Sequence, residues 1–292
     1  MFPGYQIQAT SYFRVNSAVV ISDDMSSLQN PWPDPGSPQP VVPGPVRPAP
    51  PEDPPWTGLD VLSIVAATVI ALILLPLLAV VIAHQLFFPK ASFTDIMQIP
   101  EVVLTVQILI YAVVFFLIYY LLRVRTGQFS KPLRWNWPHS SWARFLLLGG
   151  LLYFALMGLG QVLPIPKHLP IDRFFQTSRE AALMSILSVT LAPFMEELFF
   201  RGLLYPVLAR RFGVGVSIFL TGAAFGFLHG AQLKYSWAVL IIFLVGVVLT
   251  AVRAVTKSVA ASFLVHVGYN GTLSALLLVA TDGFRHLEKL NQ

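Results

Sequence analysis

The chain contains no cysteine, and charged residues make up only 11% of its 292 residues. The absence of cysteine excludes disulfide bonds, thiolate zinc sites and cysteine nucleophiles. Soluble domains usually carry about 25% charged residues, whereas this chain is 55% hydrophobic and has a mean hydropathy of +0.69. The composition therefore predicts an integral membrane protein, for which the lipid bilayer is both solvent and partner.

Charge of one sign is in slight excess, because the net charge is +5. The basic residues lie in loops between apolar runs and form no stripe, so we expect no nucleic-acid partner. With the N-terminus inside, 12 of the 19 lysines and arginines lie in cytoplasmic segments and 7 lie outside. Since cytoplasmic loops are enriched in Lys and Arg, this bias predicts a cytoplasmic N-terminus.

Proline is concentrated near the N-terminus, where 12 of the 23 prolines lie between Pro31 and Pro55. Such a segment forms neither a helix nor a strand ladder. We therefore expect residues 1–58 to form a disordered or polyproline-II-like tail. Met25 offers an alternative start to Met1, in which case the first 24 residues would be absent from the native protein.

The remainder contains seven apolar runs, each close to the ~20 residues that cross a bilayer core. The predicted fold is therefore all-α, a polytopic transmembrane bundle of about seven helices. Residues 59–144 would supply two helices and a basic interfacial loop, residues 145–280 the core, and residues 281–292 a C-terminal tail. The runs are, approximately, 59–88, 102–122, 145–163, 181–205, 214–230, 236–252 and 258–280.

The fourth run holds two adjacent carboxylates, Glu196 and Glu197, followed by Arg201. Ionisable residues cost ~2.5–3.5 kcal/mol each at mid-bilayer, so they indicate function by default. Glu197 and Arg201 are spaced i,i+4 and share a helix face, where they neutralise each other. Glu196 points ~100° away and lacks that cation, which suits a general base. Pro193 removes a backbone hydrogen bond and is expected to open the helix locally.

Two further polar groups lie on the fifth and seventh runs. His229 follows Phe225 by one turn, and His266 precedes Asn270 by one turn on a shared face. An imidazole beside an amide offers the donors of an oxyanion hole. Each group also has a structural interpretation: a histidine that caps a carbonyl, a Glu–Arg staple, or an asparagine that bonds a neighbouring helix. The occurrence of all of them in one half of the chain favours a shared site.

In order, the motifs are Glu-Glu-x-x-x-Arg (196–201), Phe-x-x-x-His (225–229) and His-x-x-x-Asn (266–270). This set resembles the CPBP family of CAAX prenyl proteases and bacteriocin-processing enzymes, also called type II CAAX endopeptidases or Abi proteins. The resemblance covers roughly residues 145–280 and implies an intramembrane peptidase. It implies that Glu196 and His229 activate water and that His266 and Asn270 stabilise the oxyanion. Glu197, Arg201 and Phe225 would support them.

Members of this family are described as metalloproteases, although a glutamate peptidase mechanism needs no cofactor. We expect no required metal; the alternative is zinc held by Glu196, His229 and His266. The expected partner is a peptide or membrane-protein substrate, in a prokaryotic inner membrane. Two other functions stay open: a non-catalytic immunity or scaffold protein that binds a peptide, and a proton-coupled transporter, which also uses Glu and His chains.

Overall fold

The computed structural model describes residues 52–288, and within this range every regular element is a helix. This confirms the predicted all-α fold. The proline-rich segment up to residue 51, the alternative start at Met25 and the last four residues of the predicted C-terminal tail lie outside the described residues. The elements are α1 (Gly58–Leu86), α2 (Phe93–Ile96), α3 (Pro100–Thr126), α4 (Trp142–Gly160), the 3₁₀ helix η1 (Pro170–Phe175), α5 (Ser178–Val189), α6 (Leu191–Glu197), the π-helix η2 (Leu198–Leu204), α7 (Tyr205–Phe212), α8 (Val214–Leu228), α9 (Ala238–Thr256) and α10 (Val259–Ala280).

Among residues 52–288, six helical segments are long and apolar enough to cross a membrane, which identifies an integral membrane protein. They correspond to six of the seven predicted runs, and the continuous segment Ser178–Phe212 comprises α5, α6, η2 and α7. The fifth run forms α8, which has only 15 residues and is a shorter apolar helix. Of the seven predicted membrane helices, six are therefore long enough to cross a membrane, and the seventh, α8, is shorter.

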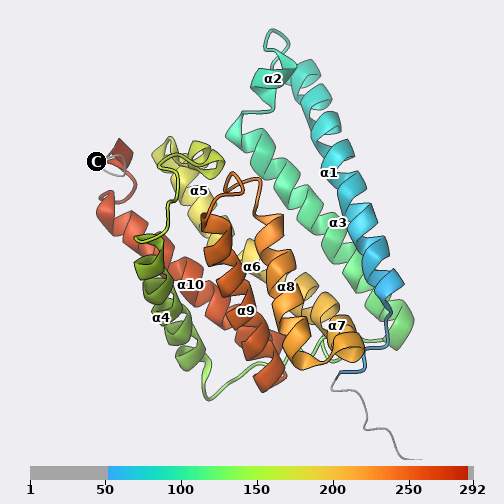
Figure 1. Cartoon of the computed structure of the whole chain (residues 1–292). Helices are drawn as coiled ribbons and strands as arrows, with labels where there is room; N and C mark the ends of the chain where they lie inside the picture. The colour runs from blue at the N-terminus through green and yellow to red at the C-terminus, as the bar shows by residue number, and fades with distance from the viewer. Residues whose placement is uncertain (1–51, 289–292) are drawn as a thin grey trace, which may run out of the picture. The chain divides into compact units, whose positions relative to one another are not determined.

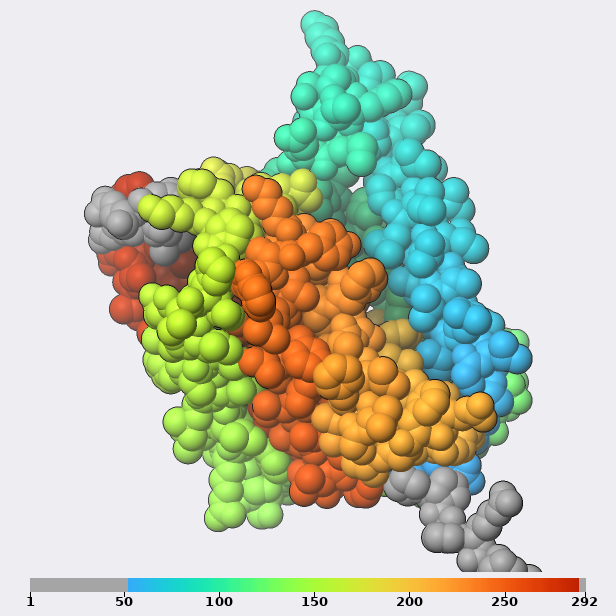
Figure 2. All heavy atoms as spheres, in the orientation of Figure 1, coloured from blue at the N-terminus to red at the C-terminus, as the bar shows by residue number. Residues whose placement is uncertain are grey.

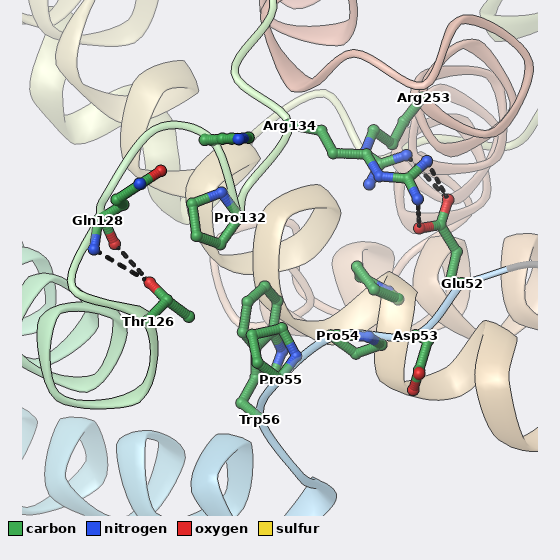
Figure 3. Close-up of a pocket in the computed structure, with 12 residues that line it drawn as sticks. Glu52, Asp53, Pro54, Pro55, Trp56, Thr126, Gln128, Pro132, Arg134 and Arg253 are labelled. Carbon is green, nitrogen blue, oxygen red and sulfur yellow. Dashed lines mark hydrogen bonds and ion pairs between the residues drawn. The ribbon is translucent and has the colours of Figure 1, made fainter.

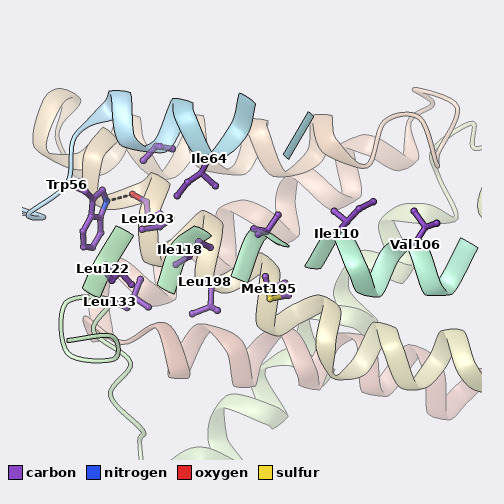
Figure 4. Close-up of a cluster of buried hydrophobic side chains, with 12 residues drawn as sticks. Trp56, Ile64, Val106, Ile110, Ile118, Leu122, Leu133, Met195, Leu198 and Leu203 are labelled. Atoms are coloured by element: carbon purple, nitrogen blue, oxygen red, sulfur yellow. Dashed lines mark hydrogen bonds between the residues drawn. The ribbon is translucent and has the colours of Figure 1, made fainter. Parts of the chain in front are cut away.

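Helices α1 and α3 lie side by side and run in opposite directions, joined through α2 (Figure 1). A buried apolar cluster attaches this pair to the segment that contains α6 and η2 (Figure 4). Ile64 of α1, Ile118 and Leu122 of α3, and Leu198 and Leu203 of η2 belong to it. Since burying an aliphatic side chain stabilises by about 1.5–3 kcal/mol, this cluster fixes the position of α3 beside η2.

The predicted tail ends at residue 58, whereas the structure packs its last residues against the bundle. The Trp56 side chain is fully buried in the same apolar cluster, and its indole Nε1 donates a 3.1 Å hydrogen bond to the carbonyl of Leu203. Thr57 then caps α1 through reciprocal bonds with Asp60. Burial of the large indole explains the difference, because one aromatic residue outweighs the effect of its proline neighbours.

The fourth run is broken at a different place from the one predicted. The sequence places the opening at Pro193, but α5 ends at Val189 and the break falls at Thr190, whose φ and ψ are −115° and −82°. Pro193 lies in the first turn of α6, where a missing N–H leaves no intrahelical bond unmade. The second irregularity is η2, a π-helical stretch directly after the glutamate pair. Such stretches often mark functional sites.

Close glycine contacts bring α4 against α10 and α8 against α9, and Figure 2 shows α4, α9 and α8 as one packed face. A Cβ at Gly149 of α4 would lie 2.1 Å from the carbonyl oxygen of Val265, and one at Gly268 would lie 2.2 Å from that of Leu146. Only glycine permits this approach. In membranes such small-residue contacts drive helix association, so they fix the positions of the helices that bear His229 and His266.

Candidate functional site

Glu197 is the centre of a buried polar network. Its side chain is fully buried, and Oε1 accepts hydrogen bonds from Arg201 Nη1 at 2.9 Å and from His266 Nδ1 at 3.0 Å. Ser262 Oγ donates to Oε2 at 2.6 Å. The i,i+4 contact with Arg201 has the predicted geometry. The contacts with α10 were not predicted, and through them Glu197 also fixes the ring of His266.

Arg201 lies in η2 and is fully buried as well. Besides Glu197, its guanidinium donates from Nε to Thr250 Oγ1 at 3.3 Å and from Nη2 to the carbonyl of Gly246 at 3.0 Å, both on α9. A buried ion pair is tolerated only when its remaining hydrogen-bonding groups are satisfied. Arg201 meets that condition, and its bonds tie the segment with both glutamates to α9.

Glu196 has different surroundings from its neighbour. Its carboxylate lies 3.8 Å from His229 Nε2 and 3.7 Å from His266 Nε2, and its side chain keeps 16% of its exposure. These separations exceed hydrogen-bond length, so Glu196 makes no direct hydrogen bond to either ring. The structure thus brings together three of the predicted site residues, from α6, from the end of α8 and from α10.

The partners of the two rings decide which nitrogen carries a proton. His229 Nδ1 is 2.9 Å from the carbonyl oxygen of Phe225, and His266 Nδ1 is 3.0 Å from the Glu197 carboxylate. Both partners are acceptors, so each Nδ1 carries a hydrogen. Each Nε2 therefore faces Glu196 as an acceptor when its ring is neutral and as a donor when its ring is an imidazolium.

Phe225 of α8 lies between these groups and is 2% exposed. Its ring centroid is 4.8 Å from that of His229 and 5.7 Å from that of His266, and the Arg201 guanidinium lies 4.6 Å from the ring centroid. A cation above an aromatic face is attracted by the ring quadrupole. The predicted supporting residue thus contacts both histidines and the buried arginine, and it limits how far either ring can turn.

Asn270 is one turn beyond His266 on α10, and its described hydrogen bond joins α10 to α5. The amide Nδ2 donates to the carbonyl of Ser188 in the last turn of α5 at 2.7 Å. This carbonyl is one of the helix-end acceptors that lack an intrahelical donor. An amide nitrogen has two hydrogens, so this bond leaves a second N–H on Asn270 and fixes the direction of the amide.

Sequence reasoning missed two residues of the network, Ser262 and Thr250. Both are fully buried, and they contact Glu197 and Arg201 respectively. A signal for Ser262 does exist, because it precedes His266 by four residues and so shares the helix face that holds Asn270. Thr250 has no comparable signal, since its bond to Arg201 joins residues 49 positions apart.

For the alternative of a zinc site, the hydrogen bonds of the histidines are favourable, but the placement of the side chains is not. Histidines that donate from one ring nitrogen to a carbonyl or carboxylate are typical of metal ligands. Among residues 52–288, however, no group of three or more His, Asp or Glu side chains is placed so as to hold a metal ion. As placed, Glu196, His229 and His266 do not form a ligand set.

An apolar cavity of about 280 Å³ adjoins the site between α3 and α6. Met195, the residue before Glu196, contributes to its wall, and the other lining residues come from α3 and the start of α6. They are Ile108, Tyr111, Ala112, Phe115, Phe116, Leu191 and Phe194. Because this wall belongs partly to α3, the helix pair outside the predicted core contributes to the surroundings of the site.

In the comparison with known proteins, a family model matches one part of the chain. Residues 178–272 match the family model described as Type II CAAX prenyl endopeptidase Rce1-like. This range contains every residue proposed for the site, while α1, α3 and α4 lie outside it. No curated protein and no solved structure matches the chain. The family resemblance predicted from the three motifs is thereby confirmed for residues 178–272, which match the Rce1-like model within an integral membrane protein.

Proposed function

We propose that this protein is an intramembrane endopeptidase that hydrolyses a peptide bond with a water molecule activated by Glu196. The observation that carries the proposal is the position of Glu196 between two imidazole Nε2 atoms, at 3.7 and 3.8 Å, beside a neighbour that is fully paired. An acid–base group must reach the reacting proton directly or through one water. In the proposed reaction, one water hydrogen-bonds to the Glu196 carboxylate and to an imidazole Nε2 at the same time.

In the proposed reaction the water oxygen attacks the carbonyl carbon of the scissile bond. One water proton passes to the Glu196 carboxylate. The other stays on the water oxygen and donates a hydrogen bond to His229 Nε2. The carbonyl oxygen becomes an oxyanion in the tetrahedral intermediate. When the C–N bond breaks, the proton on Glu196 moves to the leaving amine, and the second product is a new carboxyl group. No redox partner is needed, and the atoms balance with one water consumed.

The oxyanion is proposed to be stabilised by His266 and Asn270. His266 Nδ1–H is already committed to Glu197, so its Nε2 donates only when the ring is an imidazolium. The second N–H of Asn270 is the other donor. Removing one oxyanion-hole donor typically costs about 10²–10³ in kcat, which sets the expected size of an Asn270→Ala defect.

No step of this mechanism passes through a metal, because the described side chains form no ligand set. The proposal predicts that chelation leaves cleavage by purified protein unchanged. Loss of cleavage after chelation, restored only by zinc, would instead support the zinc alternative with Glu196, His229 and His266 as ligands.

The substrate is proposed to be a peptide or a membrane-protein segment with apolar side chains next to the scissile bond. The cavity of about 280 Å³ between α3 and α6 would accept those side chains beside Met195, since apolar pockets bind by removing apolar surface from water. A prokaryotic inner membrane and a cytoplasmic N-terminus remain our proposals for location and orientation. A reporter fused to the C-terminus would then be non-cytoplasmic.

The function is tested by comparing membrane proteomes of cells that produce wild type or Glu196→Gln. We expect precursors to accumulate in the variant, and purified variant to lose at least about 10²-fold in cleavage of those precursors. The matched control is Glu101→Gln, which makes the same change at an exposed position on α3. Turnover by Glu196→Gln equal to that of the control would contradict the proposal, and a binding role would then be favoured.

A further inference from the structure

A second buried carboxylate, Glu52, lies at the other end of the described chain, and three cationic side chains share it. Glu52 is 3% exposed. Its Oε1 lies 3.2 Å from Arg253 Nη1 and 3.4 Å from Lys257 Nζ, and its Oε2 lies 3.1 Å from Arg134 Nη2. Figure 3 shows the Glu52 side chain pointing at both arginines. We refer to Glu52, Arg134, Arg253 and Lys257 as the basic cluster.

The basic cluster is formed by segments that are remote in sequence. Arg253 lies in the last turn of α9, Lys257 caps that helix, and Arg134 lies in the loop between α3 and α4. Two contacts fix that loop to the start of α10: Ser258 Oγ donates to the Asn136 carbonyl, and Val259 N donates to the Arg134 carbonyl at 3.0 Å. The three cations are therefore held in place by the fold and not only by Glu52.

Two buried donors beside Glu52 lack an acceptor. Arg253 is 1% exposed, and its Nε atom is buried with no hydrogen-bond partner among the described residues. The same holds for the hydroxyl of Tyr205, whose ring centroid lies 5.5 Å from the Arg253 guanidinium carbon. Leaving a buried donor unpaired costs about 1–3 kcal/mol, and more on a charged group. Such a cost indicates a position at which a further acceptor binds.

A cavity of about 370 Å³ opens at this place, within the size range of small-ligand sites. Arg134, Arg253 and Glu52 line it, together with Lys131 and Trp56. The other carboxylate in the wall, Asp53, is engaged with Arg210 at 3.4 Å. Arg134, Arg253 and Lys257 thus share the single carboxylate of Glu52, and Lys131 adds a further cation to the cavity wall. This excess of positive charge favours an anion with several acceptor oxygens.

The position of the cavity indicates which anion. It lies where α3 and α9 end and where α1 and α7 begin, which for the ends of membrane-spanning helices is the level of the lipid headgroups. Lys and Arg at helix ends place their charges there, and basic pockets between membrane helices bind lipid phosphates. A phosphate offers more acceptor oxygens than a carboxylate, and arginine binds it in a bidentate manner.

We propose that the basic cluster and its cavity are a binding site for a phosphate group, at the headgroup level of the membrane. Arg253 and Arg134 hold the phosphate oxygens, Arg253 Nε donates to one of them, and Lys257 and Lys131 supply further charge. The Glu52 carboxylate competes for the same donors, so it occupies the site when no phosphate is bound. The phosphate can belong to an anionic lipid or be free in solution.

The test measures ligand binding to detergent-purified full-length protein. The probes are short-chain phosphatidylglycerol, short-chain phosphatidylcholine and inorganic phosphate, and the readouts are native mass spectrometry and thermal shift. We expect phosphatidylglycerol to bind at least about tenfold more tightly than phosphatidylcholine. Glu52→Gln should tighten binding by about tenfold, because it removes the competing charge. Saturation by inorganic phosphate, with weaker binding of phosphatidylglycerol, would identify free phosphate as the ligand.

The cations are tested with matched variants. Arg253→Gln should weaken phosphate binding by about tenfold or more, since a charge-assisted hydrogen bond is lost. Lys257→Gln should weaken phosphate binding about threefold. Because the Lys257 side chain is 43% exposed, this variant should retain the fold even if Arg253→Gln does not. Arg144→Gln makes the same charge change in the first turn of α4, outside the cavity, and should have no effect. Equal binding by wild type, Glu52→Gln, Lys257→Gln and Arg144→Gln would overturn the proposal and leave Glu52 as an anchor for residues 52–57.

Discussion

The protein buries two carboxylates among cations, and the two sites are built in opposite ways. Glu197 lies within the bundle with one arginine, and each nitrogen of Arg201 has an acceptor. Glu52 lies at the helix ends with three cations, and Arg253 Nε has no acceptor within the part of the chain that the structure describes. The first site is balanced in charge and in hydrogen bonds, while the second has an excess of both positive charge and donors.

This difference separates a structural ion pair from a site that is able to take up a ligand. A buried pair with every donor satisfied is stable by itself and gains nothing from another anion. A cluster with surplus cations stores repulsion that an added anion relieves. The contrast also separates Glu196 from Glu197, because the residue with incomplete contacts is the one we assign to chemistry.

The largest expected effect is at the balanced site. Glu197→Gln leaves the Arg201 guanidinium buried without a counter-charge, so we expect a loss of about 3–5 kcal/mol in the free energy of unfolding. Glu196→Gln should change it by less than about 1 kcal/mol, because no short hydrogen bond is lost. Unfolding in mixed micelles of SDS and mild detergent would measure both. If both variants were equally stable and inactive, the assignment of separate roles would be wrong.

A smaller effect is expected at the basic cluster. Glu52→Gln removes the shared anion of three cations, but Arg134 and Lys257 are 36% and 43% exposed and regain water. We therefore expect a loss of about 1–3 kcal/mol in lipid-free detergent, which is less than for Glu197→Gln. Anionic phosphatidylglycerol should restore more stability to this variant than to wild type. An unfolding free energy unchanged from wild type would show that the cations do not depend on Glu52.

The smallest effect on the unfolding free energy is expected for a substitution of Asp53, the residue after Glu52. Asp53 pairs with Arg210 at 3.4 Å, but its side chain is 75% exposed. Exposed ion pairs contribute about 0–1 kcal/mol, so Asp53→Asn should leave the unfolding free energy within about 0.5 kcal/mol of wild type. The same micelle assay checks this, with Glu52→Gln as the adjacent comparison. If Asp53→Asn lowered the unfolding free energy more than Glu52→Gln, the expectation that the buried carboxylate contributes more would be wrong.

Most of the fold was predictable because length and hydropathy determine membrane helices. Within the described residues, six apolar runs form helical segments that are long and apolar enough to cross a membrane, near their predicted bounds. The local features that departed from prediction depend on tertiary packing. The break at Thr190 and the π-helical turn of η2 follow from the fit of this segment against α9 and α10. The burial of Trp56 depends on a pocket formed by Leu203 and its neighbours.

The candidate site was predictable where its contacts are local. Glu197 and Arg201 are one turn apart, so their pairing followed from spacing alone. The bond from His266 to Glu197 joins residues 69 positions apart, and the one from Arg253 to Glu52 joins residues 201 positions apart. No periodicity in one sequence indicates such pairs. This is why the motifs can be found in the sequence, while the mutual orientation of their residues required the structure.

The length of α8 has a consequence for how water reaches Glu196. A helix of 15 residues is about 22 Å long, whereas the hydrocarbon core of a bilayer is about 30 Å thick. The membrane must thin around α8, or the end of the helix must remain below the headgroups. His229 lies at that end. Where the membrane thins, the path is shortened between bulk water and the carboxylate that we propose activates it.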